Sequence, residues 1–460
     1  MKKMLVSSCF AAAALAASAA ATIEKVIVRQ QWPWSTDVKV EYVLSGVSAE
    51  HPVNLAVKAY EGTAELAVPA DAISGSRFGI DKSGIGVLTI DPVAAFGKAR
   101  IAVPDFKIKL ETVDVSPDTM NEAVYKIFCL TDGTFENVTR KDLLNGKWGS
   151  VETDFAKIGG GFNTTLKDVL IWTAVTNDVK YKTTHLVMRK IPAAGKEWTI
   201  GSPTSETTWF TGIIANGYEQ PQRNVQLSED YYIGVFELTQ AQYGQISHAK
   251  TPNHVGDLFP MENAHYSSLR GNLTTAQEEG EYINWPKNTK KHIVWSSSFL
   301  GQLRSKMGGV EFDLPMEAQW EYACRAGTTT ALNSGKGLNV TNPWRAMTPE
   351  FDELGWCATN ALSVTQVVGQ KKPNAFGLYD MHGNVAEYCL DWHVAYPESP
   401  DPLVDPKGPE ADSGNRVGRG GDCSLPAAQC RSAWRESKSY WQDNIYTGLR
   451  LVCPVGKTWE

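Results

Sequence analysis

The stretch GLYDMHGNVAEYCLDW, residues 377–392, decides how the C-terminal half of this chain is interpreted. It mixes Gly, Asp, Asn and Glu with aromatic residues, and it shows neither helical periodicity nor the alternation of a half-buried strand. Asp380 and Glu387 place two carboxylates around Gly383, where the backbone can bend freely. Oxygen ligands on such a bend suit a hard cation, although the same acids can also cap turns by accepting bonds from backbone N–H groups.

The region around this stretch has little regular structure. Three helices are predicted before it, in TQAQYGQIS (239–247), WSSSFLGQLRSKMGG (295–309) and LPMEAQWEYACRAG (314–327). After Gly327 the chain is rich in Gly, Asn, Pro and Trp and has few periodic segments. A long irregular stretch inside a compact domain indicates a function or an ion that holds the loops.

The N-terminal part has a different pattern. In residues 22–111, short runs of alternating apolar and polar residues are separated by Gly, Pro and Asp. This pattern predicts an all-β, antiparallel sandwich of the immunoglobulin-like kind. Its expected role is to hold or present the rest of the chain, and it carries no catalytic cluster. Residues 112–185 are interpreted as a bridging segment with some packed strands.

Residues 1–21 have the features of a secretory signal peptide. Lys2 and Lys3 form a basic start, followed by an apolar stretch and small residues up to Ala21. We therefore expect a protein that is secreted or held in the periplasm or cell envelope. No second segment of the sequence is apolar enough to span a bilayer, so no transmembrane segment is expected in the mature chain. The net charge of −7 and the lack of any basic run exclude nucleic acid as an expected partner.

Removal of the signal peptide leaves seven cysteines, an odd number. An oxidising compartment favours disulfides, but their pairing cannot be read from the sequence. The chain contains no CxxC and no HExxH, so a zinc ribbon, a thioredoxin-type site and a histidine metal centre have no sequence support.

Six blocks of residues 186–456 resemble the sulfatase-modifying factor, or formylglycine-generating enzyme, family, and they occur in the family order. These blocks are IPAAGKEWTIGSP, VFELTQAQY, LPMEAQWEYACRAGT, VGQKKPNAFGLYDMHGNVAEYCLDWH, RGGDCSLPAAQCRSAWR and GLRLV. The resemblance implies an irregular, loop-rich α+β domain related to C-type lectin domains. The expected fold class is therefore α+β, with the immunoglobulin-like sandwich followed by this domain.

The resemblance also implies structural calcium. Asp380 and Glu387 would supply side-chain oxygens, and Gly383 and Val385 would supply carbonyls. A second calcium site would use Asn360 and the carbonyl of Ala361 in WCATNALS. The acidic stretch that completes this second site in the family is missing before VVGQKKPNAFG. If calcium is bound, its chelation is expected to lower the melting temperature.

Enzymes of the family oxidise a substrate cysteine to formylglycine with dioxygen and a copper ion, which two cysteines hold in C-x4-C spacing after RGGS. Here six residues separate Cys423 from Cys430, Asp422 replaces the Ser, and Leu425 stands near the first cysteine position. Three interpretations stay open: a copper site with shifted spacing, a structural disulfide (Cys423 to Cys430, or Cys389 to Cys430), and thiols that pack as small apolar groups. The spacing favours a structural role.

Two functions follow from these patterns. One is a formylglycine-generating-type oxidase or oxygenase that acts on a secreted protein or a small substrate. The alternative is a non-catalytic, lectin-like module that binds a secreted or surface protein or a glycan at the cell envelope. Arg431, Arg435 and Arg450 fit either function, but ion pairs with Glu317, Glu321 and other buried acids are the favoured role.

Overall fold

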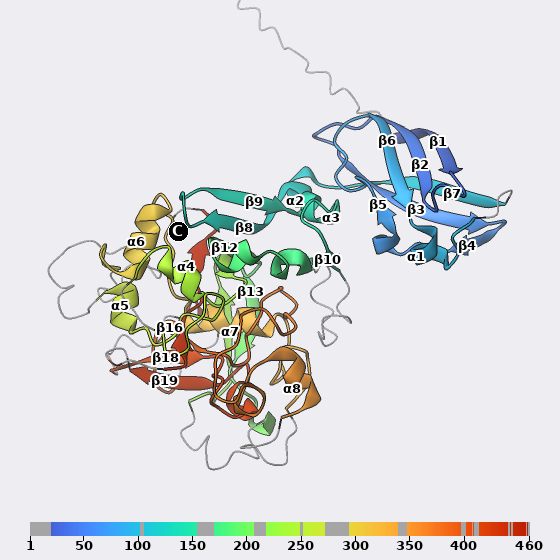
Figure 1. Cartoon of the computed structure of the whole chain (residues 1–460). Coiled ribbons are helices and arrows are strands. Elements are labelled where there is room, and N and C mark those ends of the chain that lie inside the picture. Colours follow the sequence, from blue (N-terminus) through green and yellow to red (C-terminus); the bar gives the residue numbers. More distant parts are fainter. Residues whose placement is uncertain are drawn as a thin grey trace, which may run out of the picture. The chain divides into compact units, whose positions relative to one another are not determined.

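The computed structural model describes most of the chain: residues 20–101, 105–153, 170–206, 218–248, 252–271, 294–338, 347–396, 402–406, 408, 414–439, 442, 445–456 and 458. The predicted signal peptide, 1–21, lies almost wholly outside these ranges. The chain forms two compact units (Figure 1). Unit 1 comprises Met1–Glu122 with Arg140–Lys147, and unit 2 comprises Ala123–Thr139 with Trp148–Glu460.

In unit 1 the residues that the structure describes form two antiparallel sheets and short helices. One sheet has the order β1 (Thr22–Gln30), β2 (Val38–Ser45), β6 (Gly84–Ile90), β5 (Ile73–Ser74). The other has the order β4 (Ala64–Leu66), β3 (Val53–Glu61), β7 (Phe106–Asp114). The helices are η1 (Ala70–Ala72), α1 (Pro92–Phe96), α2 (Pro117–Asn121) and α3 (Arg140–Leu144).

The alternation of apolar residues explains these strands. In VKVEYVLS of β2 every second side chain is buried, and in β7 Phe106, Ile108 and Leu110 point inward in the same way. Residues of both sheets form one hydrophobic cluster. The predicted all-β character of this unit is therefore seen within its described residues, apart from the short helices, whereas the immunoglobulin-like classification stays a prediction.

The described residues of unit 2 form four sheets. The largest is antiparallel, with the order β21 (Val452–Pro454), β15 (Tyr231–Gly234), β12 (His185–Ile191), β8 (Ala123–Cys129), β9 (Phe135–Thr139). A mixed sheet has the order β13 (Lys196–Ile200), β14 (Arg223–Leu227), β17 (Leu403–Val404). Another mixed sheet has the order β19 (Arg435–Ser439), β18 (Asn415–Arg419), β16 (Ala386–Trp392), β20 (Thr447–Gly448). The fourth pairs β10 (Val151–Glu152) with β11 (Ile171–Trp172).

The helices of unit 2 are short. They are η3 (Thr173–Thr176), η4 (Val179–Lys182), η5 (Thr204–Glu206), α4 (Gln240–Gly244), α5 (Tyr266–Arg270), α6 (Phe299–Lys306), α7 (Glu317–Arg325), α8 (Pro349–Leu354), α9 (Ala358–Ala361) and η6 (Ala427–Gln429). The three predicted helices correspond to α4, α6 and α7. Helix α7 ends at Arg325, and its C-cap Ala326 has a left-handed φ of 43°. No helix in the described ranges has the length and apolarity that crossing a bilayer requires.

The segment 112–185 does not form one bridge. Its first residues finish β7 and form α2 in unit 1, whereas β8 and β9 belong to the largest sheet of unit 2. The chain is thus a mixed α+β protein made mostly of sheets, and the predicted α+β class is confirmed at that level. The core of unit 2 gathers residues from its largest sheet, from α5 to α7 and from β16.

Candidate functional site

The quoted stretch 377–392 is a bent loop that continues into the buried strand β16. Four of its residues have left-handed backbone angles: Gly377 (φ 80°), Asp380 (φ 57°), Gly383 (φ 89°) and Asn384 (φ 65°). A Cβ on Gly383 would lie 1.8 Å from the carbonyl oxygen of Trp356, so only glycine fits there. Strand β16 is buried at every position, which explains why its sequence shows no alternation.

The carboxylate of Glu387 is held by two side chains. Arg450 donates to it from Nη2 at 2.7 Å and from Nε at 3.0 Å, and the Trp320 indole donates from Nε1 at 2.5 Å. The Arg450 and Glu387 side chains are 0% and 1% exposed. Both carboxylate oxygens therefore accept bonds from protein donors inside the core.

Arg450 also binds three backbone carbonyls. Its Nη1 donates to Gly234 at 2.9 Å and to Val235 at 3.1 Å, and its Nη2 donates to Tyr379 at 2.9 Å. These oxygens come from β15, from the residue after it and from the bent loop. Carboxylate and carbonyl oxygens thus surround a cation, as the sequence suggests, but the cation in this structure is a guanidinium.

Two further acids lie beside this ion pair. Glu237 accepts from the Asn384 amide at 2.6 Å and from the Val385 N–H at 3.1 Å. Burial raises its pKa well above the ordinary value, and the charges of Asp380 and Glu387 add to the effect. Burial also raises the pKa of Asp380 to about 6, although the Gly369 N–H, Arg450 and Lys182 act against it.

These contacts do not fit calcium at the first predicted site. Of its four residues, Glu387 is engaged by Arg450 and Trp320, and Asp380 accepts from the Gly369 N–H through Oδ2 at 2.6 Å. Asp380 Oδ1 is the one side-chain oxygen of the pair without a hydrogen bond. In the described part of the chain no three His, Cys, Asp or Glu side chains gather in a way that could hold a metal ion. Calcium at 380–387 stays a prediction that these side-chain contacts do not support.

The second predicted calcium site has the same difficulty. The Asn360 side-chain oxygen accepts from the Cys357 N–H at 2.8 Å, while its amide nitrogen donates to Asp352. The carbonyl of Ala361 accepts from the Val364 N–H at 3.1 Å. Both oxygens therefore complete the turn of α9, which does not fit a role as free calcium ligands.

The cysteines are thiols in this structure. All seven that follow the signal peptide are free, so neither Cys423–Cys430 nor Cys389–Cys430 is bonded. Cys423 and Cys430 are fully buried, and Cys430 packs with Cys357 and alanines in one apolar cluster. Of the three interpretations, this arrangement corresponds to thiols that pack as small apolar groups.

The surroundings of the two thiols do not fit a resident copper ion. Copper(I) binds thiolates, yet burial raises the pKa of both the Cys423 and the Cys430 thiol well above the ordinary range. The nearby charges are mostly negative, since Asp422 and Glu237 raise the pKa of Cys423 further. Position 425 is a leucine, so the family's first cysteine has no counterpart there.

The other predicted arginines form buried ion pairs. Arg435 binds Glu317 in a bidentate pair at 2.5 and 2.8 Å, which confirms the role expected for it. Arg431 binds Glu206 at 2.6 Å and Glu219 at 2.8 Å. The predicted partner Glu321 instead binds Arg325 and Arg419.

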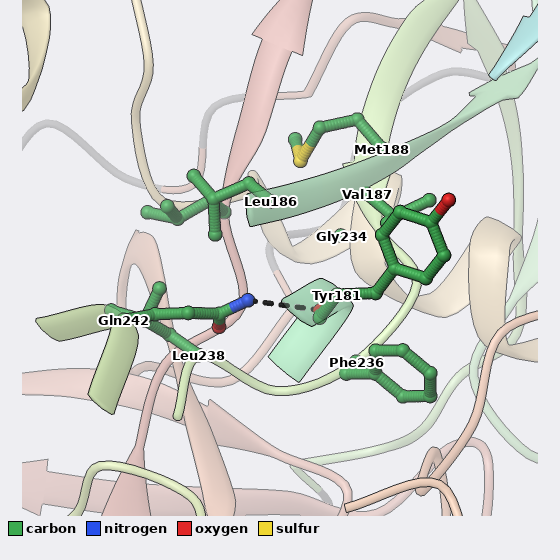
Figure 2. Close-up of a pocket in the computed structure, with 9 residues that line it drawn as sticks. Tyr181, Leu186, Val187, Met188, Gly234, Phe236, Leu238 and Gln242 are labelled. Atoms are coloured by element: carbon green, nitrogen blue, oxygen red, sulfur yellow. Dashed lines mark hydrogen bonds between the residues drawn. The ribbon is translucent and has the colours of Figure 1, made fainter. Parts of the chain in front are cut away.

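A small cavity lies between β12 and α4 (Figure 2). Its volume is about 10 Å³. Gln242, which lines the cavity, donates a hydrogen bond from its side-chain amide to the Tyr181 carbonyl at 3.1 Å. A space of this size holds about one water molecule. The cavity is therefore too small for a substrate.

A second cavity of about 190 Å³ is lined by Asp391 and Arg435 among others, and neither of the two thiols is among its lining residues. Asp391 Oδ2 accepts from the Glu317 N–H at 2.6 Å. Burial, followed by the charge of Glu317, raises the pKa of Asp391 to about 7, against the opposing effects of that N–H and of Arg435. No periodic pattern or motif in the sequence indicates this cavity, because its walls come from segments that lie far apart along the chain.

Asp391 makes folding stability depend on pH. Because its pKa is raised in the folded state, its favourable contribution is complete below its unfolded pKa, near 4, and is lost as the pH rises toward 7. Asp391→Asn keeps the acceptor for Glu317 and removes the titration. The stability of this variant relative to the native chain is therefore expected to increase between about pH 4 and pH 7. Denaturant unfolding across this range measures the difference; a pH-independent difference would contradict the assignment.

Comparisons with known proteins identify a family for the C-terminal part of the chain. Residues 195–455 match the FGE-sulfatase family model, described as "Sulfatase-modifying factor enzyme 1-like domain". "Chaperone protein LppX" of Paenibacillus barcinonensis is 32% identical over 201 residues, which cover 39% of this chain and 68% of that protein. The "Formylglycine-generating enzyme" of Thermomonospora curvata is 33% identical over 151 residues, which cover 30% of this chain and 48% of that enzyme.

A solved structure, "Treponema denticola variable protein 1", is also similar. It has 24% sequence identity and a TM-score of 0.42, and the match covers 59% of this chain and 95% of that one. The chain spans only about half the length of the Thermomonospora curvata enzyme.

Proposed function

Because the chain belongs to the sulfatase-modifying factor enzyme 1-like family, we propose that it is an exported ligand-binding member of this family that does not oxidise cysteine. The two cysteines nearest the family's copper positions carry this proposal, since both are buried and free, and the charged side chains near them are mainly acids. A thiol that is hard to ionise neither binds Cu(I) well nor reacts as a nucleophile.

Two other observations support this function. The N-terminal sequence predicts export, and an exported chain would meet secreted or envelope partners. Among the relatives, one carries the name chaperone while others carry the name of an oxidising enzyme, so the same domain occurs in proteins with different names. The expected ligand is a secreted or surface protein or a glycan. We expect its binding to need no calcium ion at residues 380–387.

The formylglycine-generating enzymes among the relatives favour oxidation as the competing function. The test is to supply the full chain with Cu(I), dioxygen and a Cys-x-Pro-x-Arg peptide, with the Thermomonospora curvata enzyme run in parallel. We expect neither formylglycine nor oxygen uptake above the protein-free rate. Formylglycine formation that is lost in Cys430→Ala would overturn the proposal.

Thiol labelling supplies an independent readout. Apart from Cys9 of the predicted signal peptide, only Cys129 is not buried, so it is expected to react alone in the native chain. The other thiols should react only after denaturation. Rapid native labelling of Cys423 or Cys430 would show an accessible pair and argue for the oxidase.

A further inference from the structure

Arg223, at the start of β14, is buried in unit 2, and none of the residues that the structure describes is its counter-ion. It is 5% exposed, and its Nε has no hydrogen-bond partner. Within the described residues its guanidinium makes no ion pair, although other buried arginines of this unit, such as Arg435 and Arg450, each bind a glutamate. A buried charge is costly unless it is paired, so an anion bound beside Arg223 would remove this cost.

Arg223 lines the 190 Å³ cavity described above. This volume exceeds the roughly 10–15 Å³ that one water molecule needs and is below the about 300 Å³ at which sites for drug-sized ligands begin. Half of the other lining residues are apolar, namely Ile200, Val225, Ala318, Leu403 and Pro406. The ligand that fits such a space is small and has an apolar body with one polar end.

The polar wall favours a single negative charge. Glu317 is compensated because Arg435 binds both of its oxygens. The raised pKa of Asp391, about 7, lets its carboxyl donate a hydrogen bond near neutral pH instead of repelling an anion. Arg223 is then the one uncompensated cation on the described wall. A guanidinium fork matches a carboxylate, while a phosphate dianion would need more positive charge.

We propose that this cavity binds a small carboxylate with a branched or short aliphatic body, and that Arg223 is its counter-ion. The inference rests on the proposed binding function and names the class of ligand. Two sources share this chemistry: a free short-chain acid, and the terminal carboxylate of a polypeptide that ends in a small apolar residue.

Calorimetric titration of the full chain tests this site. Isovalerate is expected to bind saturably, and isovaleramide, which has the same shape without the charge, at least about tenfold more weakly. A peptide ending in free valine and its amide form the second arm. Stronger binding of the acid peptide than of isovalerate identifies a polypeptide end as the source, and the reverse identifies a free acid. Equal binding of acids and amides, or no saturable binding of either acid, would overturn the proposal, and so would preference for inorganic phosphate.

Two variants separate binding from folding. Arg223→Met should abolish isovalerate binding without lowering the melting temperature, because it removes a buried charge that has no partner. Leu403→Trp keeps Arg223 and should reduce binding by filling the cavity. Unchanged affinity in either variant, or a melting temperature that falls strongly in Arg223→Met, would refute the assignment. Formylglycine formation by the native chain would instead refute the proposed function, whatever the titration shows.

Discussion

Arg450→Met is expected to destabilise unit 2 by about 3–5 kcal/mol, because it leaves Glu387 charged and unpaired in the core. The loss extends beyond one ion pair, since Arg450 also satisfies the carbonyls of Gly234, Val235 and Tyr379. Denaturant unfolding followed by tryptophan fluorescence measures the change. Of the fifteen tryptophans, all except Trp32 and Trp34 belong to unit 2, so this signal reports the correct unit.

A matched control breaks an exposed ion pair. The Lys336 and Glu350 side chains are 61% and 38% exposed, so Lys336→Ala should cost no more than about 1 kcal/mol. The double variant Arg450→Met with Glu387→Leu should be less destabilised than the sum of the single variants, because it removes both charges. An Arg450→Met variant as stable as Lys336→Ala would show that the ion pair does not support the core.

Gly383→Ala is the second substitution with a large expected effect, about 3 kcal/mol or more. The new methyl group would lie 1.8 Å from the Trp356 carbonyl oxygen, and the backbone φ of 89° is unfavourable for alanine. The bend must then open, which moves the loop that places Glu387 beside Arg450. Unfolding curves of the purified variant provide the value.

Gly195→Ala separates the clash from the backbone strain. Its φ of 68° is also left-handed, yet no atom lies within 4 Å of the added Cβ. We expect this control to cost about 1–2 kcal/mol, from strain alone. If Gly383→Ala were no more destabilising than Gly195→Ala, the close approach to Trp356 would have no energetic weight.

The local elements were predictable where the pattern is periodic or a cap is present. Every second side chain of β2 is buried, and Thr239 is the N-cap of α4, where its hydroxyl accepts from the Gln242 N–H at 3.1 Å. Strand β16 was not predicted as a strand because all seven of its side chains are buried, which removes the alternation that reveals a half-buried strand.

The site was predictable only in part. Oxygen atoms around 380–387 do surround a positive charge. The sequence could not show that Arg450 supplies this charge, because Arg450 lies 63 residues after Glu387 in the chain. The role of Glu237 was missed for the same reason, since its partners Asn384 and Val385 lie far along the chain. Arg223 has no local signal at all, because its lack of a counter-ion is a property of the packed core.

The melting temperature of the native full chain, recorded with a chelator and with added Ca²⁺, distinguishes a loop held by Arg450 from a loop held by calcium. If the Arg450 guanidinium is the cation that holds the bent loop, both conditions should give the same melting temperature. A saturated calcium site would instead contribute about 2.7 kcal/mol at one hundred times its Kd, and removal of the ion would lower the melting temperature by roughly 5 °C or more. Such a decrease, reversed by Ca²⁺ and absent in Glu387→Gln, would contradict this account.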